Sequence, residues 1–294
     1  MKGITRAAGE WRLIPQGAYL RWAYRLELGR RLDLETPRTF TEKQQWLKGR
    51  GERFSALADG AAAREYALEA LGPGYLAPLV GLYDRAEQIP WQSLRGKVVV
   101  RCTHGAWEGL ILEGGEGAGT GRARGQLRRW LGRRGDGAGR DPIYRGIRPR
   151  VLVERYLGEG EGQALEYRVM CFNGAPEIIQ AHQRGAGRYA VTFYAADGRR
   201  LGISWRGHPV TGPARLEEGT LLRLLSAGLA LARRGGTPYL RADFYWAKER
   251  LWFSRLAFSD DSGFQGFRPE AADRYLGGLL RLDGLDGAGQ EGDE

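Results

Sequence analysis

The stretch LRADFYWAKERLWFSRLAFSDDSGF, residues 240–264, carries two strand-like runs separated by a short polar turn. Aromatic and branched apolar residues alternate with polar ones over Tyr239–Trp246 and again over Leu251–Phe258. Alternation with a period of two is typical of a strand with one buried face. The segment Ala247–Arg250 between the runs is short enough for a hairpin. The sequence therefore predicts a terminal antiparallel hairpin over residues 239–258.

Asp243 lies in the middle of the first run, which is otherwise rich in aromatic residues. A carboxylate at a half-buried position needs a partner, because burying an unpaired charge is costly. The hairpin brings Arg255 opposite Asp243 to within one residue of register, close enough for the two side chains to pair. Two facing carboxylates would hold Mg²⁺ against triphosphate oxygens, but the second position here is a guanidinium. We therefore predict an Asp243–Arg255 salt bridge in place of a metal, with Asp260 or Asp261 as an alternative second ligand.

The region before this hairpin alternates short apolar runs with turns. Asn173-Gly174 is a strong hairpin signal, because both residues tolerate the positive φ of a tight turn. The predicted strands are residues 98–102, 110–112, 151–157, 167–172, 177–181 and 191–194, and an amphipathic helix over 216–234 follows them. Strands first, then one helix and a terminal hairpin favour an α+β fold with a mainly antiparallel sheet.

Roughly the first 75 residues have a helical pattern. Residues 11–35 alternate aromatic residues or Leu with Arg, which predicts an amphipathic helix. Such a helix lies on a membrane surface or, more commonly, docks on the protein's own core. Thr39 and Glu42 have the spacing of a capping box, and Asp59 is a candidate cap for a further helix that ends at Gly72.

Residues 114–140 are rich in Gly and Arg. Their composition predicts a mobile, basic loop or lid, with a short helical core at Gln126–Leu131. A nucleic-acid binder would use this charge, but no recognition motif accompanies it. We therefore expect no specific nucleic-acid partner.

The 294-residue chain has a formal net charge of +10 and a sequence pI of about 9.8, which favours anionic partners. Only five of its basic residues are Lys, so the bias towards Arg also suggests genome composition. No apolar run approaches the ~18 residues of a membrane span, and the start lacks a secretory pattern, so we expect a cytoplasmic protein. Cys102 and Cys171 lack metal-site spacing and are expected to be buried free thiols.

Two further segments are candidates for ligand contact. In RCTHGAWEG, residues 101–109, Arg101 stands at the end of a predicted strand, and a turn of small residues follows it. The Arg101 guanidinium and the backbone N–H groups of the turn could bind phosphate oxygens. His104 in this turn is a candidate ligand or a structural imidazole. Trp107 and Glu108 count against an anion site, because Trp107 is bulky and Glu108 repels negative charge. In VLVERYL, residues 151–157, Glu154 is either an adenine-side carboxylate or an exposed strand residue.

These segments occur in a specific order. TFTEKQQWLK, DGAAAREYALEALGPGYLAPL, RCTHG, VLVERYL, EYRVMCFNGAPEII and LRADFYW…FSRLAFSDDSGFQGFRPE together resemble the TupA-like ATP-grasp amide-ligase family of teichuronopeptide and capsular-polysaccharide synthesis. The resemblance covers about residues 39–277. It implies an ATP-grasp fold of two α+β lobes with mainly antiparallel sheets: a helical region over 1–85, lobe one over 86–157 and lobe two over 158–294.

The resemblance also implies an activity and its residues. ATP with Mg²⁺ would phosphorylate a carboxylate, and an amine would attack the acyl phosphate. The substrates would be an amino acid and an anionic sugar or peptide polymer, with polysaccharide-synthesis proteins as partners. The implied cofactor-binding residues are Arg101, His104, Gly105, Glu154 and Tyr156, the implied metal ligand is Asp243, and the implied catalytic positions are Arg168 and Arg255.

The sequence departs from the family at the positions that hold ATP and metal. Gly60 stands where the family has Lys, Ala106 and Trp107 replace small-loop Ser and Gly, Arg255 replaces the metal-binding Glu, and Ala257 replaces a Thr. A non-catalytic relative that binds a nucleotide or anionic sugar is therefore the alternative to a ligase. A glycosyltransferase is a weaker alternative, because Asp260 and Asp261 are adjacent rather than spaced as Asp-x-Asp.

Overall fold

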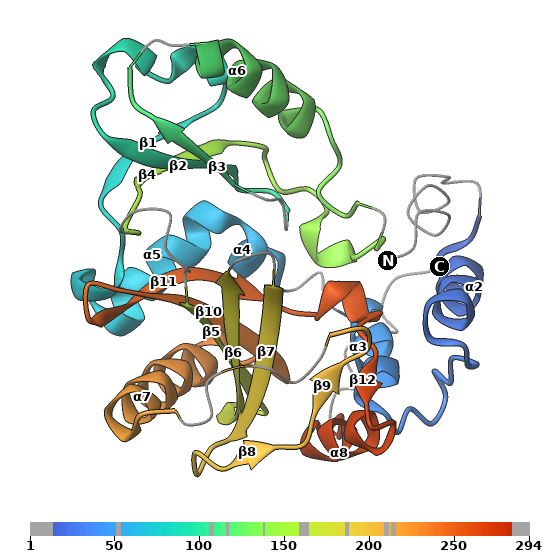
Figure 1. Cartoon of the computed structure of the whole chain (residues 1–294). Helices are drawn as coiled ribbons and strands as arrows, with labels where there is room; N and C mark the ends of the chain where they lie inside the picture. Colours follow the sequence, from blue (N-terminus) through green and yellow to red (C-terminus); the bar gives the residue numbers. More distant parts are fainter. Residues whose placement is uncertain are drawn as a thin grey trace.

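The computed structural model describes residues 14–50, 54–105, 109–115, 118–137, 139–158, 165–185, 188–208, 212 and 216–283. They form two sheet-based lobes, with one helix at the side of the larger lobe (Figure 1). Residues 1–13, 106–108, 159–164 and 284–294, which include parts of the predicted segments, lie outside the described residues. Among the described residues, no helix is both long and apolar enough to cross a membrane.

Lobe one is a four-stranded antiparallel sheet. Its strand order is β1 (Leu79–Tyr83), β4 (Val151–Arg155), β2 (Lys97–Cys102) and β3 (Leu110–Glu113). The helix predicted to end at Gly72 ends at Leu71, and β1 follows it within the region 1–85. Valines of β2 and β4 and the thiol of Cys102 form the core of this lobe.

Helix α6 (Ala118–Leu131) covers this sheet, as Figure 1 shows at the top of the molecule. The expectation of a loop over residues 114–140, with a helical core only from 126, is wrong for this part. Ala123, Leu127 and Trp130 are buried against the valines of the sheet. They follow one another at helical spacing, so burial of this stripe outweighs the low helix propensity of the intervening glycines.

Lobe two is a six-stranded antiparallel sheet. Its strands follow the order β11 (Arg250–Ala257), β10 (Tyr239–Ala247), β5 (Leu165–Phe172), β6 (Ala175–Gly185), β7 (Arg188–Ala195) and β8 (Arg200–Leu201). The hairpin predicted over 239–258 is β10–β11. Asn173 and Gly174 form the predicted turn between β5 and β6, both with positive φ.

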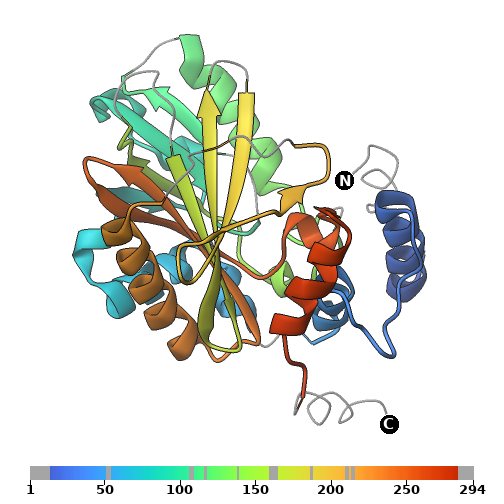
Figure 2. The same ribbon diagram turned by 60° about the horizontal axis from the view of Figure 1, so that its bottom comes forward.

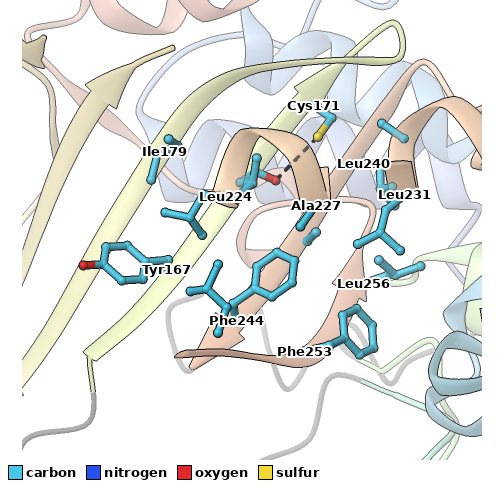
Figure 3. Close-up of a cluster of buried hydrophobic side chains, with 14 of the residues drawn as sticks. Tyr167, Cys171, Ile179, Leu224, Ala227, Leu231, Leu240, Phe244, Phe253 and Leu256 are labelled. Carbon is cyan, nitrogen blue, oxygen red and sulfur yellow. Dashed lines mark hydrogen bonds between the residues drawn. The ribbon is translucent and has the colours of Figure 1, made fainter. Parts of the chain in front are cut away.

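Helices cover both faces of this sheet (Figure 2). On one face, α7 (Glu218–Gly235) buries Leu224 and Leu231 against the strands (Figure 3). Helix α5 (Gly60–Leu71) buries Ala67 in the same cluster. On the other face, α3 (Phe40–Lys48), α8 (Ala271–Leu279) and the ribbon of β9 (Ser204–Trp205) and β12 (Phe267–Arg268) bury an aromatic cluster around Phe40. The helices are therefore not confined to a region separate from the lobes.

The predicted caps are present at two of these helices. Thr39 accepts a hydrogen bond from the Glu42 N–H, and the Glu42 carboxylate accepts from the Thr39 N–H, so the capping box at α3 is confirmed. Asp59 caps α5 by accepting from the Ala61 N–H at 2.8 Å. The aromatic helix α2 (Gln16–Leu28) buries one face against Phe264 of the same chain, which agrees with a helix that docks on its own core.

Candidate functional site

The alternation of side chains along β10 places charged groups on one face of the lobe-two sheet. Leu240, Ala242 and Phe244 point into the core beneath α7. Because neighbouring residues of a strand point to opposite faces, Arg241 and Asp243 lie on the other face. The cross-strand register then sets Arg168 of β5 on one side of Asp243 and Arg255 of β11 on the other.

Asp243 is completely buried within this row and accepts hydrogen bonds from two arginines. Arg241 donates from Nε and Nη2 to its two oxygens at 2.7 and 2.9 Å. Arg255 donates from Nε to Oδ2 at 2.8 Å, so the predicted salt bridge is confirmed. Arg168 Nε lies 3.9 Å from the same oxygen. Each carboxylate oxygen of Asp243 therefore already has a cationic partner.

The electrostatics of this row keep Asp243 ionised. Burial by itself would raise the pKa of the carboxyl. The charges of Arg241, Arg255 and Arg168 outweigh that effect and hold the pKa of Asp243 well below its ordinary value. The carboxylate is consequently a fixed negative charge that binds the surrounding guanidinium groups.

Arg241 was not singled out from the sequence, although it lies between two buried carboxylates. It forms a bidentate pair with Asp243, and its Nη1 also pairs with Asp260. Asp260 further accepts from the Tyr239 hydroxyl at 3.0 Å. The signal that points to it is its position two residues before Asp243, because i and i+2 share a strand face. Asp260, the suggested replacement metal ligand, is thus bound to Arg241.

These residues do not fit a magnesium ion. Mg²⁺ needs free carboxylate oxygens, whereas the oxygens of Asp243 accept from guanidinium groups. In the part of the chain that the structure describes, no group of three His, Cys, Asp or Glu side chains is arranged to hold a metal ion. A fixed guanidinium charge at Arg255 also repels a divalent cation.

Arg168 and Arg255 both keep hydrogen-bonding capacity. Arg168 uses Nε on Glu166 at 2.8 Å and lies over the Trp205 ring at 5.7 Å. Arg255 uses Nε on Asp243, and its side chain is 34% exposed. Across the described ranges, no hydrogen bond reaches the terminal Nη atoms of either arginine. These planar N–H groups suit the oxygens of a phosphate or carboxylate.

A second network joins the two lobes. Glu154 on β4 is buried and accepts from Arg64 of α5 and from Arg101 of β2, the latter at 2.8 Å. Arg101 also donates from Nη1 to the carbonyl oxygen of Ser254 in β11 at 2.8 Å. Its Nε is buried and lacks a hydrogen-bond partner within the described residues. Arg101 and Glu154, each expected to contact a nucleotide, therefore bind each other.

A β-bulge makes one of the contacts between the lobes. The pairing of β10 with β11 shifts between Asp243 and Phe244, and Ser254 is left out of the register. A bulge residue falls outside the ladder, which leaves its backbone groups for other partners. The Ser254 carbonyl meets Arg101 in this way, directly beside Arg255. The two arginine networks thus adjoin where the lobes meet.

The remaining candidates lie elsewhere in lobe one. His104 is buried, and its Nε2 is 3.1 Å from the carbonyl oxygen of Arg133, beyond the end of α6. Burial lowers the pKa of its imidazole. Gly105 is the last described residue before the gap at 106–108. The Tyr156 N–H donates to the Lys97 carbonyl at 3.0 Å, and its phenol ring fills the space beside Gly158.

Comparison with known proteins agrees with this geometry. The two lobes and the ordered strands define an ATP-grasp architecture. A family model described as TupA-like ATPgrasp matches residues 42–281, so the chain belongs to the TupA-like ATP-grasp family. The resemblance inferred from the ordered motifs is therefore confirmed. No protein with a curated description matches the sequence.

Solved structures with a similar fold are distant in sequence. D-alanine–D-alanine ligase from Bacillus anthracis complexed with ATP is 13% identical, with a TM-score of 0.44 over 69% of this chain and 55% of that one. The ATP-grasp ligase PsnB complexed with its minimal precursor is 11% identical, with a TM-score of 0.41 over 72% and 55%. L-amino acid ligase from Bacillus licheniformis is 10% identical, with a TM-score of 0.42 over 83% and 47%. This chain thus spans about half the length of these structures.

Proposed function

We propose that this chain is a non-catalytic ATP-grasp protein that binds the phosphate groups of a nucleotide, without Mg²⁺, where its two lobes meet. The observation that carries the proposal is the hydrogen bond of 2.8 Å from Arg255 Nε to Asp243 Oδ2. It holds a permanent guanidinium charge at the position where the family resemblance implies a metal-binding Glu. An ATP-dependent ligase needs that position to hold a cation against the triphosphate.

The arginines offer a different way to hold phosphate. Arg168 and Arg255 flank one carboxylate and retain terminal N–H groups, which form paired hydrogen bonds with phosphate oxygens. Arg101 contributes a buried Nε without a partner among the described residues. A guanidinium donates hydrogen bonds to phosphate oxygens, but it does not supply the Lewis-acid chemistry that Mg²⁺ would supply in phosphoryl transfer. These residues therefore suit binding of the ligand and not transfer of its phosphoryl group.

Calorimetry of ATP binding with and without Mg²⁺ tests this proposal. We expect the wild type to bind ATP equally well in both conditions, and Arg255→Glu to bind only when Mg²⁺ is present. Arg250→Glu is the matched control, because Arg250 is exposed on the same strand and stacks on Trp252. Wild-type binding that requires Mg²⁺, with Arg255→Glu unchanged from it, would contradict the proposal.

An ATP-dependent carboxylate–amine ligase of cell-surface polymer synthesis is the second candidate. The family match over residues 42–281 favours it, because the resemblance to this family implies that an amine is joined to a carboxylate through an acyl phosphate. Its substrates would be an amino acid and an anionic sugar or peptide polymer, met in the cytoplasm beside polysaccharide-synthesis proteins. Release of ADP by the wild type, dependent on both an amino acid and a uronic acid, would establish this candidate and rule out the first.

A further inference from the structure

A small cavity lies at the end of α3, apart from the two arginine networks. Polar side chains of Gln44, Lys48 and Asp141 line it together with the apolar side chains of Phe54, Ile143 and Phe258. The lining comes from α3, from the segment around η5 (Pro142–Tyr144), and from the lobe-two hairpin. The cavity therefore combines apolar walls with a few polar groups, which is the usual composition of a small-molecule site.

Lys48 places a buried ammonium group in this cavity. Its side chain is only 3% exposed, and Nζ donates one hydrogen bond, to the Gly139 carbonyl oxygen at 2.9 Å. An ammonium has three N–H donors. Nζ also lies 4.8 Å from the centre of the Phe264 ring. Among the described residues no carboxylate lies within salt-bridge distance of Nζ, so its charge is incompletely neutralised.

Gln44 supplies a second donor. The residue is 1% exposed, and its Oε1 accepts from the Asp260 N–H at 3.4 Å. The amide nitrogen Nε2 is buried and has no hydrogen-bond partner in the described part of the chain. Buried polar groups are normally satisfied, so an unpaired one beside a cavity indicates a missing partner. Lys48 and Gln44 are four residues apart on one helix, which places them on the same face.

We infer that this cavity binds the carboxylate group of a small monocarboxylic acid, with Lys48 and Gln44 as its hydrogen-bond donors and the apolar wall around Phe54 as the surface for its alkyl part. A single carboxylate matches two donors of this kind. Asp141 also lines the cavity, but its oxygens accept from the Ile143 N–H at 3.4 Å and the Ser259 hydroxyl at 3.2 Å. Its charge limits the site to one negative group.

A chain of contacts connects this cavity to the arginine row. Gln44 Oε1 accepts from the Asp260 N–H, the Asp260 carboxylate pairs with Arg241, and Arg241 pairs with Asp243. The acid would therefore lie behind the proposed nucleotide site, not in it. The inference does not depend on nucleotide binding, because none of its donors belongs to that site.

The ionisation of Lys48 supports the inference. Burial lowers the pKa of the ammonium to about 8, against the opposing charges of Asp141 and Asp261. Besides Asp141, the other polar groups that line the cavity around it are Gln44, Arg50, Thr237 and Tyr239. A bound carboxylate favours the charged form and raises this pKa, so affinity should fall as pH rises through about 8.

Nuclear magnetic resonance of lysine side chains tests the inference on the full wild-type chain. The sequence has five lysines, and Lys48→Met assigns the signal of interest. Titration with sodium propionate should shift the Lys48 signal and raise its pKa by about one unit, which is a tenfold preference for the charged form. The signal of Lys97, exposed on lobe one, should stay unchanged. An unchanged Lys48 pKa at saturating propionate would overturn the inference.

Variants provide the second measurement. Calorimetry should show propionate affinity at least tenfold weaker in Lys48→Met and in Gln44→Leu, and unchanged in Lys97→Met. Affinity for the wild type should also fall about eightfold between pH 7 and pH 10, in step with the charge on Lys48. Equal binding by Lys48→Met, or binding that ignores pH in this range, would show that propionate binds elsewhere and would reject the site.

Discussion

Arg255 and Asp243 stand directly opposite each other on neighbouring strands, and Nε of the arginine lies 2.8 Å from Oδ2 of the aspartate. Arg168 occupies the matching position on the other side of Asp243. In an antiparallel sheet such cross-strand neighbours interact most strongly. Three adjacent strands are thus tied together by one buried carboxylate. The ion pair therefore links neighbouring strands of the sheet.

Removal of Arg255 should destabilise the protein. In Arg255→Met, Asp243 loses one charge-assisted hydrogen bond but keeps Arg241, so we expect a loss of about 1.5–3 kcal/mol of unfolding free energy. Urea unfolding of the wild type, Arg255→Met, Asp243→Asn and the double variant measures it. The double variant should lose less than the sum of the single losses. Strict additivity would show that the two side chains do not interact.

The same carboxylate predicts a weakness in acid. The pKa of Asp243 is held below its ordinary value of 3.8 by the arginines, despite burial. A carboxyl with a depressed folded-state pKa stabilises the protein above the unfolded-state pKa and loses that contribution as pH falls below it. Unfolding free energy should therefore decline below about pH 4. The decline, followed by urea unfolding at successive pH values, should be shallower in Asp243→Asn; equal slopes would contradict this origin.

The contacts of Arg101 predict that this residue stabilises the attachment of lobe one to lobe two. Arg101→Met removes the bond to the Ser254 carbonyl and one of the two partners of Glu154. Hydrogen exchange followed by mass spectrometry should show faster exchange around β2 and β11, with a stability loss of about 1.5–3 kcal/mol. Arg128→Met is the control, because Arg128 pairs with Glu87 on the exposed surface of lobe one alone. Equal exchange rates in both variants would show that Arg101 does not stabilise the attachment of the lobes.

The two cysteines should be unreactive in the folded protein. Cys102 and Cys171 are buried free thiols, and burial raises the pKa of each to about 12. Because the thiolate is the nucleophile, very little reactive form exists at neutral pH. A chromogenic disulfide reagent should modify neither thiol in buffer and both in denaturant. Fast modification of native protein, absent in Cys102→Ala or Cys171→Ala, would identify a reactive thiol.

The sequence determined much of this site because the relevant contacts follow local patterns. Alternation along 239–258 and a short turn set the register of the hairpin, and the register alone places Arg255 opposite Asp243. The capping box at Thr39 and the turn at Asn173 are equally local. Such features depend on residues within a few positions of one another, so they can be predicted without knowledge of the tertiary structure.

Other features depend on contacts between distant segments. Helix α6 is stabilised by burial of Ala123, Leu127 and Trp130 on lobe one, which a Gly- and Arg-rich composition conceals. The Asp260–Arg241 pair forms after a bend in the chain, and the Arg101 contact needs both lobes in place. The cavity at Lys48 is assembled from three separate parts of the sequence. The residue pattern of a single strand or helix does not predict these contacts between distant segments.

The bulge at Ser254 makes the hydrogen bond from Arg101 independent of the side chain that stands at position 254. Its acceptor is a peptide carbonyl, which every amino acid carries, so another small residue at the buried position 254 should preserve it. Only the Arg101 side of the bond is open to selection through a side chain. Related chains can therefore carry different small residues at position 254 and keep the bond to Arg101. The side chain at this position does not indicate whether the bond is present.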